Sequence, residues 1–205
     1  MKIQNIQLPK IIKSLAIATP LLLASPAIRA QQIETNQQDV FIKTVAPKDK
    51  KIIADSLFMS PELIVGGKEI YPAIVVDLSE GQLYHYDYDT YLKEIYPIAS
   101  GKTTTPTKTG LRIINNIEKY PYKNAPKSTK RYNNPDDYGT HLLNLSIVDP
   151  KTGDIIGNNG QFIHGTNKPN SIGQKASKGC IRVQNEVIDK LASSLEAGQY
   201  VLIKE

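Results

Sequence analysis

Cysteine and histidine are scarce in this chain of 205 residues, which has one cysteine, Cys180, and three histidines. A single thiol cannot form an intramolecular disulfide, so the stability of the fold has to come from a packed core. The histidines at positions 85, 141 and 164 are scattered and, with one cysteine, match no zinc-ligand spacing. We therefore expect no bound metal and no other cofactor.

Acidic residues are absent from the first 33 positions, where three lysines precede an apolar run over residues 14–28. This layout is typical of a secretory signal. The run is interrupted by two prolines and is shorter than the roughly 20 apolar residues of a membrane-spanning helix. We expect residues 1–30 to be a signal peptide that is cleaved after Ala30, with residues 25–27 as a second candidate cleavage site. The mature protein would be exported to the periplasm or cell wall without stable membrane insertion.

The mature chain is also nearly neutral. Removal of residues 1–30 takes away four of the 25 basic residues and none of the 20 acidic ones, which lowers the formal net charge from +5 to +1. Nucleic-acid binding usually requires a clustered basic face, so we set nucleic-acid partners aside. The remaining 175 residues are enough for one domain with a sizeable core, which we expect to be a monomer.

Strands are predicted where β-branched and aromatic residues gather between Gly, Pro, Asn and Asp. These runs cover residues 73–78, 82–88, 91–99, 111–114, 141–148, 161–164 and 200–204. Apolar residues recur at helical spacing between Asn185, a candidate N-cap, and Gly198, so a helix is expected there. The pattern predicts a mainly β fold with an antiparallel core and one packed helix.

The segment before the main domain, residues 31–70, begins with polar residues of little periodicity. A short helix is expected over residues 51–59, and Gly66-Gly67 break the chain further on. We expect residues 31–70 to form an N-terminal linker or arm, and residues 71–205 to form the main domain.

A long stretch without a regular pattern covers residues 115–140 and contains several lysines and tyrosines. Loops of this length are often lids or binding loops, and a solvated surface insertion is the alternative. The tyrosines of residues 82–88 could stack on sugars, but cross-strand pairing explains them without a ligand. His85 and His141 lie in predicted strands and are expected to be structural.

Cys180 stands within the segment SKGCIR at residues 177–182, sixteen residues after His164. An unpaired thiol is a liability in an oxidising compartment, which suggests a chemical role. Only the thiolate attacks a carbonyl efficiently, and His164 could take the thiol proton and return it to a leaving amine. Lys178 and Arg182 could add a positive field. A cysteine nucleophile is therefore the leading hypothesis.

The residues beside Cys180 suggest supporting roles. Gly179 lets the backbone approach the substrate closely, so the amides of Gly179 and Cys180 could stabilise an oxyanion. Ser177 could hydrogen-bond His164 or the substrate. Arg182 could form a salt bridge within the loop or recognise a carboxylate.

The segment IHGT at residues 163–166, followed by SKGCIRV at residues 177–183, resembles the L,D-transpeptidase catalytic domain, the YkuD-type fold. The resemblance covers roughly residues 71–204, including an opening hairpin at residues 73–84 and a turn at residues 100–110. It implies a mainly β, sandwich-like catalytic domain with one packed helix and a long capping loop. The implied substrates are the stem peptides of peptidoglycan.

The resemblance also assigns roles to individual residues. Cys180 is the implied nucleophile, and His164 is the implied proton acceptor and donor. The amides of Gly179 and Cys180 would form the oxyanion hole, and the other implied site residues are Ser177, Arg182, Gly165 and Lys178. One departure from the family is Lys178, because the family often has histidine at this position.

The implied reaction is a two-step acyl transfer. Cys180 attacks the carbonyl of the third stem residue, a diamino acid, releases the terminal D-alanine and becomes a thioester. The side-chain amine of a neighbouring stem then resolves the thioester and gives a 3→3 cross-link, whereas water as acceptor would give L,D-carboxypeptidase activity. Two further hypotheses are attachment of a lipoprotein by the same site and a non-catalytic wall-binding module of this fold. Carbapenems are expected to acylate Cys180.

Overall fold

The structure, a computed structural model, describes residues 59–121 and 126–205. The expected signal peptide at residues 1–30 and most of the expected linker, including the predicted helix as far as residue 58, lie outside the described residues. Within the two described ranges, no helix combines the length and the apolar character that a membrane span needs.

A nine-stranded sheet forms the centre of the described chain, in the order β12-β10-β8-β7-β13-β3-β4-β5, with β9 paired to β8. In addition, β1 pairs with β2, and β6 pairs with β11. The strands are β1 (Leu63–Val65), β2 (Lys68–Ile70), β3 (Ile74–Asp77), β4 (Gln82–Tyr86), β5 (Leu92–Pro97), β6 (Ser100–Gly101), β7 (Gly110–Lys119), β8 (His141–Val148), β9 (Ile155–Gly157), β10 (Phe162–His164), β11 (Lys175–Ser177), β12 (Ile181–Arg182) and β13 (Tyr200–Lys204).

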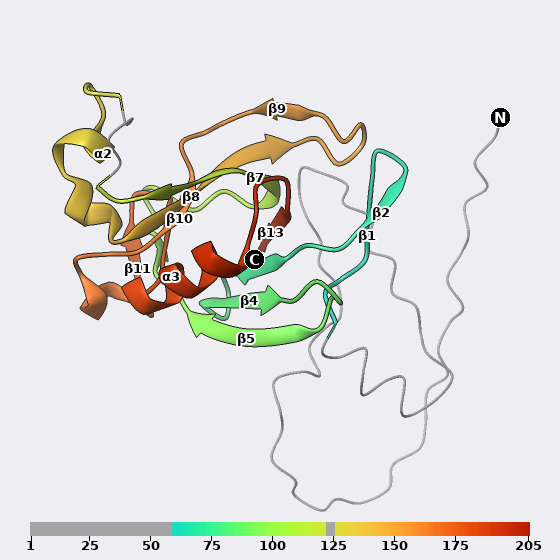
Figure 1. Ribbon diagram of the computed structural model, residues 1–205, viewed down its shortest axis with the longest axis horizontal. Coiled ribbons are helices and arrows are strands. Elements are labelled where there is room, and N and C mark those ends of the chain that lie inside the picture. The colour runs from blue at the N-terminus through green and yellow to red at the C-terminus, as the bar shows by residue number, and fades with distance from the viewer. Residues whose placement is uncertain (1–58, 122–125) are drawn as a thin grey trace, which may run out of the picture. The chain divides into compact units, whose positions relative to one another are not determined.

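The sheet curls around the main helix, α3 (Asn185–Ser194). Figure 1 shows β8 and β10 on one side of α3 and β4 and β5 on the other. Side-chain contacts agree with this view, because Lys190 of α3 pairs with Glu94 of β5 and Ser194 meets His85 of β4. The shorter helices are α2 (Lys130–Asn133), η2 (Pro135–Tyr138) and η3 (Pro169–Ser171).

The central strands bury both of their faces. On β3, Val76 joins the apolar cluster that contains Ile188 and Leu191 of α3, whereas its neighbour Val75 joins a second cluster with Leu63 of β1. Successive side chains of a strand point to opposite faces, so one continuous apolar run supplies both clusters.

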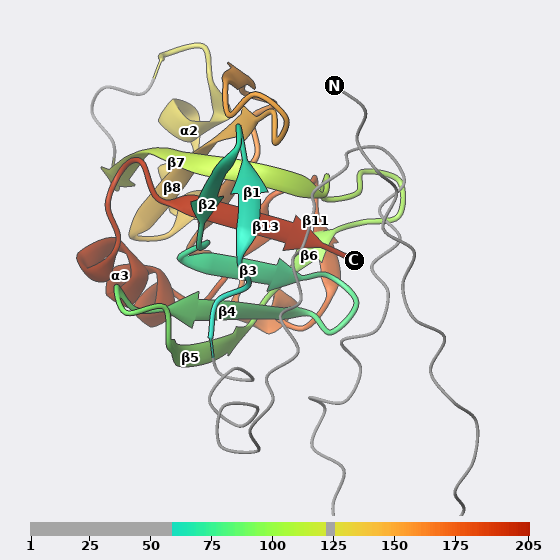
Figure 2. The same ribbon diagram turned by 90° about the vertical axis from the view of Figure 1, so that its right-hand side faces the viewer.

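The hairpin of β1 and β2 falls within the segment that was expected to be a linker or arm. Leu63 is fully buried and Val65 is 3% exposed, and both pack against Val75 and Leu202. Figure 2 shows this hairpin crossing in front of β13 and β3. The end of the arm is therefore packed on the face of the sheet that α3 does not cover.

The prediction of a mainly β fold with one packed helix is confirmed, and β8 and β13 have the predicted bounds. The prediction that residues 115–140 are irregular is wrong in part, because β7 continues to Lys119 and α2 and η2 follow. The ladder between β7 and β8 shifts register between Ile114 and Asn116. Such a bulge interrupts the alternation of apolar residues, which concealed the second half of the strand.

The prediction of an antiparallel core also needs correction. Most strand pairs are antiparallel, but β13–β3, β10–β12 and β11–β6 are parallel. Strand β13 follows α3 and enters the sheet between β7 and β3. Strand β13 is antiparallel to β7 and parallel to β3, and the sequence pattern does not reveal which strands become its neighbours.

Candidate active site

Two neighbouring strands bring His164 and Cys180 together. Strand β10 ends at His164, and β12 begins one residue after Cys180. The two strands pair in parallel with His164 opposite Arg182. Both His164 and Cys180 line one cleft of about 280 Å³. A single strand pairing thus closes the sixteen-residue gap between them in the sequence.

The imidazole of His164 is buried and neutral, a state in which it can accept a proton. It is 3% exposed, and burial lowers its pKa to about 4, with the charge of Arg182 acting in the same direction. Nδ1 lies 2.5 Å from the carbonyl oxygen of Gly165. A carbonyl only accepts hydrogen bonds, so the single proton of the neutral ring is on Nδ1 and Nε2 carries a lone pair.

The Cys180 thiol is half-buried, and its Sγ donates toward the carbonyl oxygen of Gly160 at 3.8 Å. Burial raises the pKa of this thiol, while a hydrogen bond with the Phe162 backbone and the charges of Arg182 and Lys130 oppose the rise. The resting pair is therefore a neutral thiol beside a neutral imidazole. For such a thiol to act as a nucleophile, a base would have to remove its proton before or during attack.

Ser177 shapes the turn that carries the thiol and does not bond His164 in this structure. Its Oγ donates to the carbonyl oxygen of Cys180 at 2.5 Å and accepts the amide of Gly179 at 3.0 Å. Gly179 has φ +111°, a conformation that side chains disfavour. Because the amide of Gly179 is engaged within the turn, the amide of Cys180 is the better candidate for an oxyanion donor.

The segment that follows β6 supports this turn from the other side. The amide of Lys102 and the hydroxyl of Thr105 both donate to the carbonyl oxygen of Ser177, at 3.0 and 3.3 Å. Next to them, Ala99 and Arg182 exchange two backbone hydrogen bonds of 2.8 and 2.9 Å. The turn at residues 100–110, which the resemblance to the family includes, is thus part of the site's support.

Gly165 acts through its backbone, since its carbonyl orients His164. A Cβ at Gly165 would lie 2.3 Å from Oδ1 of Asn185, so only glycine fits without displacement. Asn185 was expected to cap α3, but the cap position is Gln184. The Asn185 Oδ1 instead accepts the amide of Thr166 at 2.9 Å and holds the loop after His164.

The cleft carries an excess of positive charge. Among the described residues, the charged side chains that line it, apart from His164 and Cys180, are Lys102, Lys130, Lys168, Lys178, Arg182 and the carboxylate Asp137. Asp137 already pairs with Lys130. The other cations are therefore available to acidic groups of a ligand.

Arg182 has no ion pair within residues 59–121 and 126–205, and its Nε is buried there without a hydrogen-bond partner. A buried charged donor of this kind is costly unless a partner arrives. Of the two roles that the sequence left open, carboxylate recognition is therefore favoured over an internal salt bridge.

Helices α2 and η2 cover one side of the cleft and are anchored by a buried carboxylate. Glu118 is 2% exposed, and Arg131 Nη1 lies 2.7 and 2.6 Å from its two oxygens. The hydroxyl of Tyr120 donates to the same carboxylate at 3.0 Å. Tyr138 of η2 then lies against His164, with ring centroids 4.9 Å apart. Sequence reasoning missed Tyr138, because the tyrosine content of the long stretch marks no single position.

The other two histidines lie outside this cleft. His141 pairs with Asp189 at 2.6 Å on the outer side of α3, and His85 lies on β4 beside Ser194. The structure thus brings only His164 of the three histidines to the thiol.

Three kinds of comparison relate the chain to known proteins. The family model of the L,D-transpeptidase catalytic domain, YkuD, matches residues 71–203. A Bacillus licheniformis protein named as the L,D-transpeptidase YkuD is 35% identical over 130 residues, which are 63% of this chain and 64% of that protein. A Bacillus subtilis protein of the same name is 37% identical over 108 residues, which are 53% of this chain and 51% of that protein. The chain thus spans less than two thirds of the length of these relatives.

A crystal structure of an Enterococcus faecium L,D-transpeptidase is similar with a TM-score of 0.48 and 24% identity, over 64% of this chain and 49% of that one.

Proposed function

The chain belongs to the L,D-transpeptidase catalytic-domain family, and from this premise we propose that it is a cysteine L,D-transpeptidase that forms 3→3 cross-links between peptidoglycan tetrapeptide stems. The observation that carries the proposal is the cleft that the Cys180 thiol shares with His164, whose Nε2 lone pair is unprotonated. The cations of the cleft support it further, because stem peptides carry carboxylates.

In the first step, His164 Nε2 takes the proton of Cys180 while the sulfur attacks the carbonyl carbon of the third stem residue. The carbonyl oxygen becomes an oxyanion, to which we assign the amide of Cys180 as donor. The tetrahedral intermediate then expels the terminal D-alanine, whose amine receives the proton from His164. A thioester on Cys180 and a neutral imidazole remain.

In the second step, the uncharged side-chain amine of a neighbouring stem attacks the thioester carbonyl. His164 takes a proton from this amine, and the carbon–sulfur bond breaks. The sulfur of Cys180 receives the proton back, so the thiol is restored and a new amide bond joins the two stems. The reaction needs no oxidant and no cofactor.

The buried surroundings decide the timing of the first proton transfer. Burial raises the pKa of Cys180 and lowers that of His164, so a separated thiolate and imidazolium are disfavoured before substrate binds. We therefore expect the proton to move as the sulfur attacks, with no stable ion pair beforehand.

The test is incubation of the protein from residue 31 onward with disaccharide-tetrapeptide, followed by mass spectrometry. We expect loss of D-alanine and formation of a cross-linked dimer, both absent in Cys180→Ala. His164→Gln should lower the rate by about 100-fold or more, because it removes the general base. His141→Gln is the matched control outside the cleft and should retain activity. Full activity of Cys180→Ala would contradict the mechanism.

The products of this incubation also identify the acceptor. A dimer joined through the third stem residues supports the transpeptidase, whereas tripeptide without dimer assigns water as the acceptor. If neither forms and a carbapenem also fails to acylate Cys180, the chain is a non-catalytic wall-binding module. Transfer to a lipoprotein would require an acceptor protein in the mixture and would give a covalent adduct of it.

We further propose that the protein is exported to the periplasm or cell wall, as its N-terminal 30 residues suggest. Sequencing of the N-terminus from fractionated cells tests this. A mature chain that begins at Gln31, or at Ile28 for the second cleavage site, is the expected result. Recovery of the intact N-terminus from the cytosolic fraction would contradict it.

A further inference from the structure

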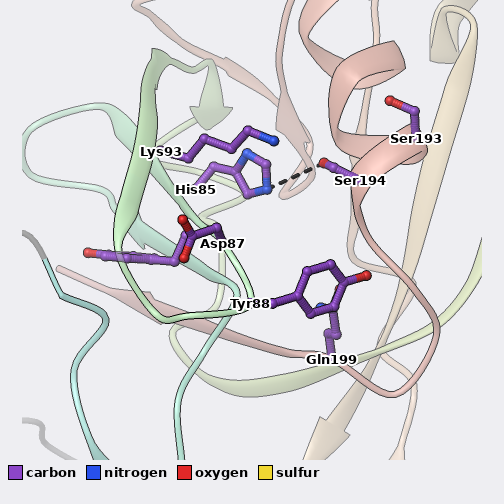
Figure 3. Close-up of a pocket in the computed structure, with 8 residues that line it drawn as sticks. His85, Asp87, Tyr88, Lys93, Ser193, Ser194 and Gln199 are labelled. Carbon is purple, nitrogen blue, oxygen red and sulfur yellow. Dashed lines mark hydrogen bonds between the residues drawn. The ribbon is translucent and has the colours of Figure 1, made fainter.

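A second cavity, of about 140 Å³, lies where the hairpin of β4 and β5 meets the end of α3. In Figure 3, His85 and Lys93 point from this hairpin toward α3, which presents Ser193 and Ser194. The cavity shares no lining residue with the catalytic cleft. Helix α3 connects the two, because it begins at Asn185 beside the catalytic loop and ends at Ser194, about 14 Å further along its axis.

His85 brings an unsatisfied hydrogen-bond acceptor to this cavity. The residue is 3% exposed, and its Nδ1 has no hydrogen-bond partner within the described part of the chain. The hydroxyl of Ser194 donates to the carbonyl oxygen of Lys190 at 2.9 Å, so it accepts from Nε2 of His85 at 3.4 Å. The ring proton is then on Nε2, and Nδ1 is a bare lone pair. A buried lone pair of this kind is stabilised by a hydrogen-bond donor, such as the hydroxyl group of a ligand.

Lys93 lies beside His85 in this cavity (Figure 3). Lys93 lines the same cavity and is an exposed, flexible side chain whose charge acts on His85. A change of its rotamer alters the space beside the His85 imidazole without movement of the backbone.

The charges of the cavity favour a neutral ligand. Lys93 and Asp87 are its charged side chains and cancel each other. His85 is neutral at pH 7, because burial, aided by the charge of Lys93, lowers its pKa. The carbonyl end of α3 adds a partial negative charge, which disfavours an anion.

Size and shape narrow the ligand class further. Tyr88, which lines the cavity, is 72% exposed and offers an aromatic ring at its edge. The volume of 140 Å³ corresponds to about five water molecules at roughly 30 Å³ each. The cavity therefore has room for the hydroxyl-bearing edge of one sugar ring. The exposed ring of Tyr88 can stack on such a sugar, and the hydroxyl and carboxylate groups beside it can bind its hydroxyl groups, so the lining suits a saccharide.

We propose that this cavity binds one saccharide ring of the glycan strand that carries the stem peptides, with Tyr88 stacking on the ring and His85 Nδ1 accepting one of its hydroxyl groups. The saccharide class follows from the cavity alone, whereas the choice of the wall glycan depends on the proposed function. The bound ring would place the protein on the same strand whose stems enter the catalytic cleft.

The test is a titration of the protein from residue 31 onward with chitotetraose, a tetramer of N-acetylglucosamine without peptide, followed by amide NMR. We expect shifts at residues 85–88 and 193–199. Tyr88→Ala should weaken the affinity about fivefold or more, through loss of the aromatic contact. Ser193→Trp should block the cavity and abolish binding. Tyr132→Ala, at an exposed tyrosine of α2, is the matched control and should bind as the wild type does.

Thermal unfolding of each variant shows whether it is folded, so a loss of binding can be assigned to the cavity. Shifts confined to the catalytic cleft, undiminished binding by Ser193→Trp, or no binding at all would overturn the proposal. Because the probe contains no peptide, the result is independent of turnover. Saccharide binding without D-alanine release would support this saccharide site and contradict the proposed function. D-alanine release without saccharide binding would contradict the saccharide site alone.

Discussion

At the scale of single residues, the candidate site consists of buried polar groups whose protons are assigned by their neighbours. His164 and Cys180 could be recognised in the sequence, because their residue types and spacing carry the chemistry. The role of Ser177 could not, since a hydroxyl can donate to several partners and the turn at Gly179 decides which. The acceptor for His164 Nδ1 was equally hidden, because any nearby carbonyl would serve and the backbone conformation selects Gly165.

His164 should make the protein less stable in mild acid. Its pKa of about 4 in the folded state lies below the ordinary value of 6.5, so the unfolded chain binds the proton more tightly. Stability from this group is complete above about pH 6.5 and is lost as the pH falls through 4. The expected loss is about 2 kcal/mol between about pH 7 and pH 4.5, at 1.36 kcal/mol per pKa unit.

Urea unfolding of the wild type and of His164→Gln at both pH values measures this effect. The variant should lose about 2 kcal/mol less than the wild type over the interval, while contributions from other groups cancel in the comparison. Equal losses in the two proteins would show that His164 titrates normally.

Gly139 should tolerate alanine far less well than Gly67 does. Both have positive φ, +68° and +77°, so both substitutions carry backbone strain, and the ψ of −145° at Gly139 lies in a region that is essentially restricted to glycine. A Cβ at Gly139 would also lie 2.6 Å from Cα of Gly165 and 2.2 Å from Oδ1 of Asn185, whereas nothing lies within 4 Å of a Cβ at Gly67. Gly139→Ala should therefore be about 2 kcal/mol less stable than Gly67→Ala by urea unfolding.

The same pair of variants separates stability from activity. Displacement of Gly165 moves the carbonyl that orients His164, so Gly139→Ala should also lower the rate of D-alanine release in conditions where it is folded. A Gly67→Ala protein as unstable as Gly139→Ala would show that the close approach of two loops at Gly139 adds no measurable cost.

At the scale of secondary-structure elements, α2 and η2 are too short to be stable alone, since isolated helices below about 12 residues are marginal in water. They are held by Glu118 and by the stacking of Tyr138 on Tyr120, with ring centroids 5.7 Å apart. Four-residue helices have no apolar periodicity, so the sequence indicated a lid, a binding loop or a surface insertion here, without its helices.

Arg131→Met should release this segment from the sheet. It leaves the Glu118 carboxylate buried without its cation, and loss of one partner of a buried ion pair costs about 3 kcal/mol or more. Urea unfolding should show this loss, and hydrogen exchange should accelerate in residues 130–138. The double variant Arg131→Met/Glu118→Gln should recover much of the stability, because no unpaired charge remains. A single-variant loss below about 1 kcal/mol would mean that the ion pair does not anchor the segment.

At the scale of the whole molecule, the described chain has two apolar clusters, one on each face of the sheet. The cluster beneath α3 could be predicted, because α3 and the strands have clear apolar periodicity. The cluster beneath the β1–β2 hairpin could not, since three-residue strands carry too little pattern to separate them from a linker.

A protein that begins at residue 71 should therefore be less stable than one that begins at residue 59. The truncation removes Leu63 and Val65 and exposes Val75 and Leu202 to water. Burial of such a side chain contributes about 1.5–3 kcal/mol, so exposure of Val75 and Leu202 gives an expected loss of about 3–6 kcal/mol. Urea unfolding of the two proteins measures it. Equal stability of the two proteins would mean that the β1–β2 hairpin does not stabilise the fold.

By itself, the sequence determined the mainly β class, the bounds of β8 and β13 and the position of α3. It also indicated His164 and Cys180 as the candidate catalytic pair. These follow from periodicity, turn residues and a compact motif, which are all local along the chain. Only the tertiary structure decided the parallel partners of β13 and β12, the contact of Tyr138 with His164 and the gathering of cations around the thiol. Each of these joins residues far apart in sequence, whose proximity exists only once the sheet has assembled and curled around α3.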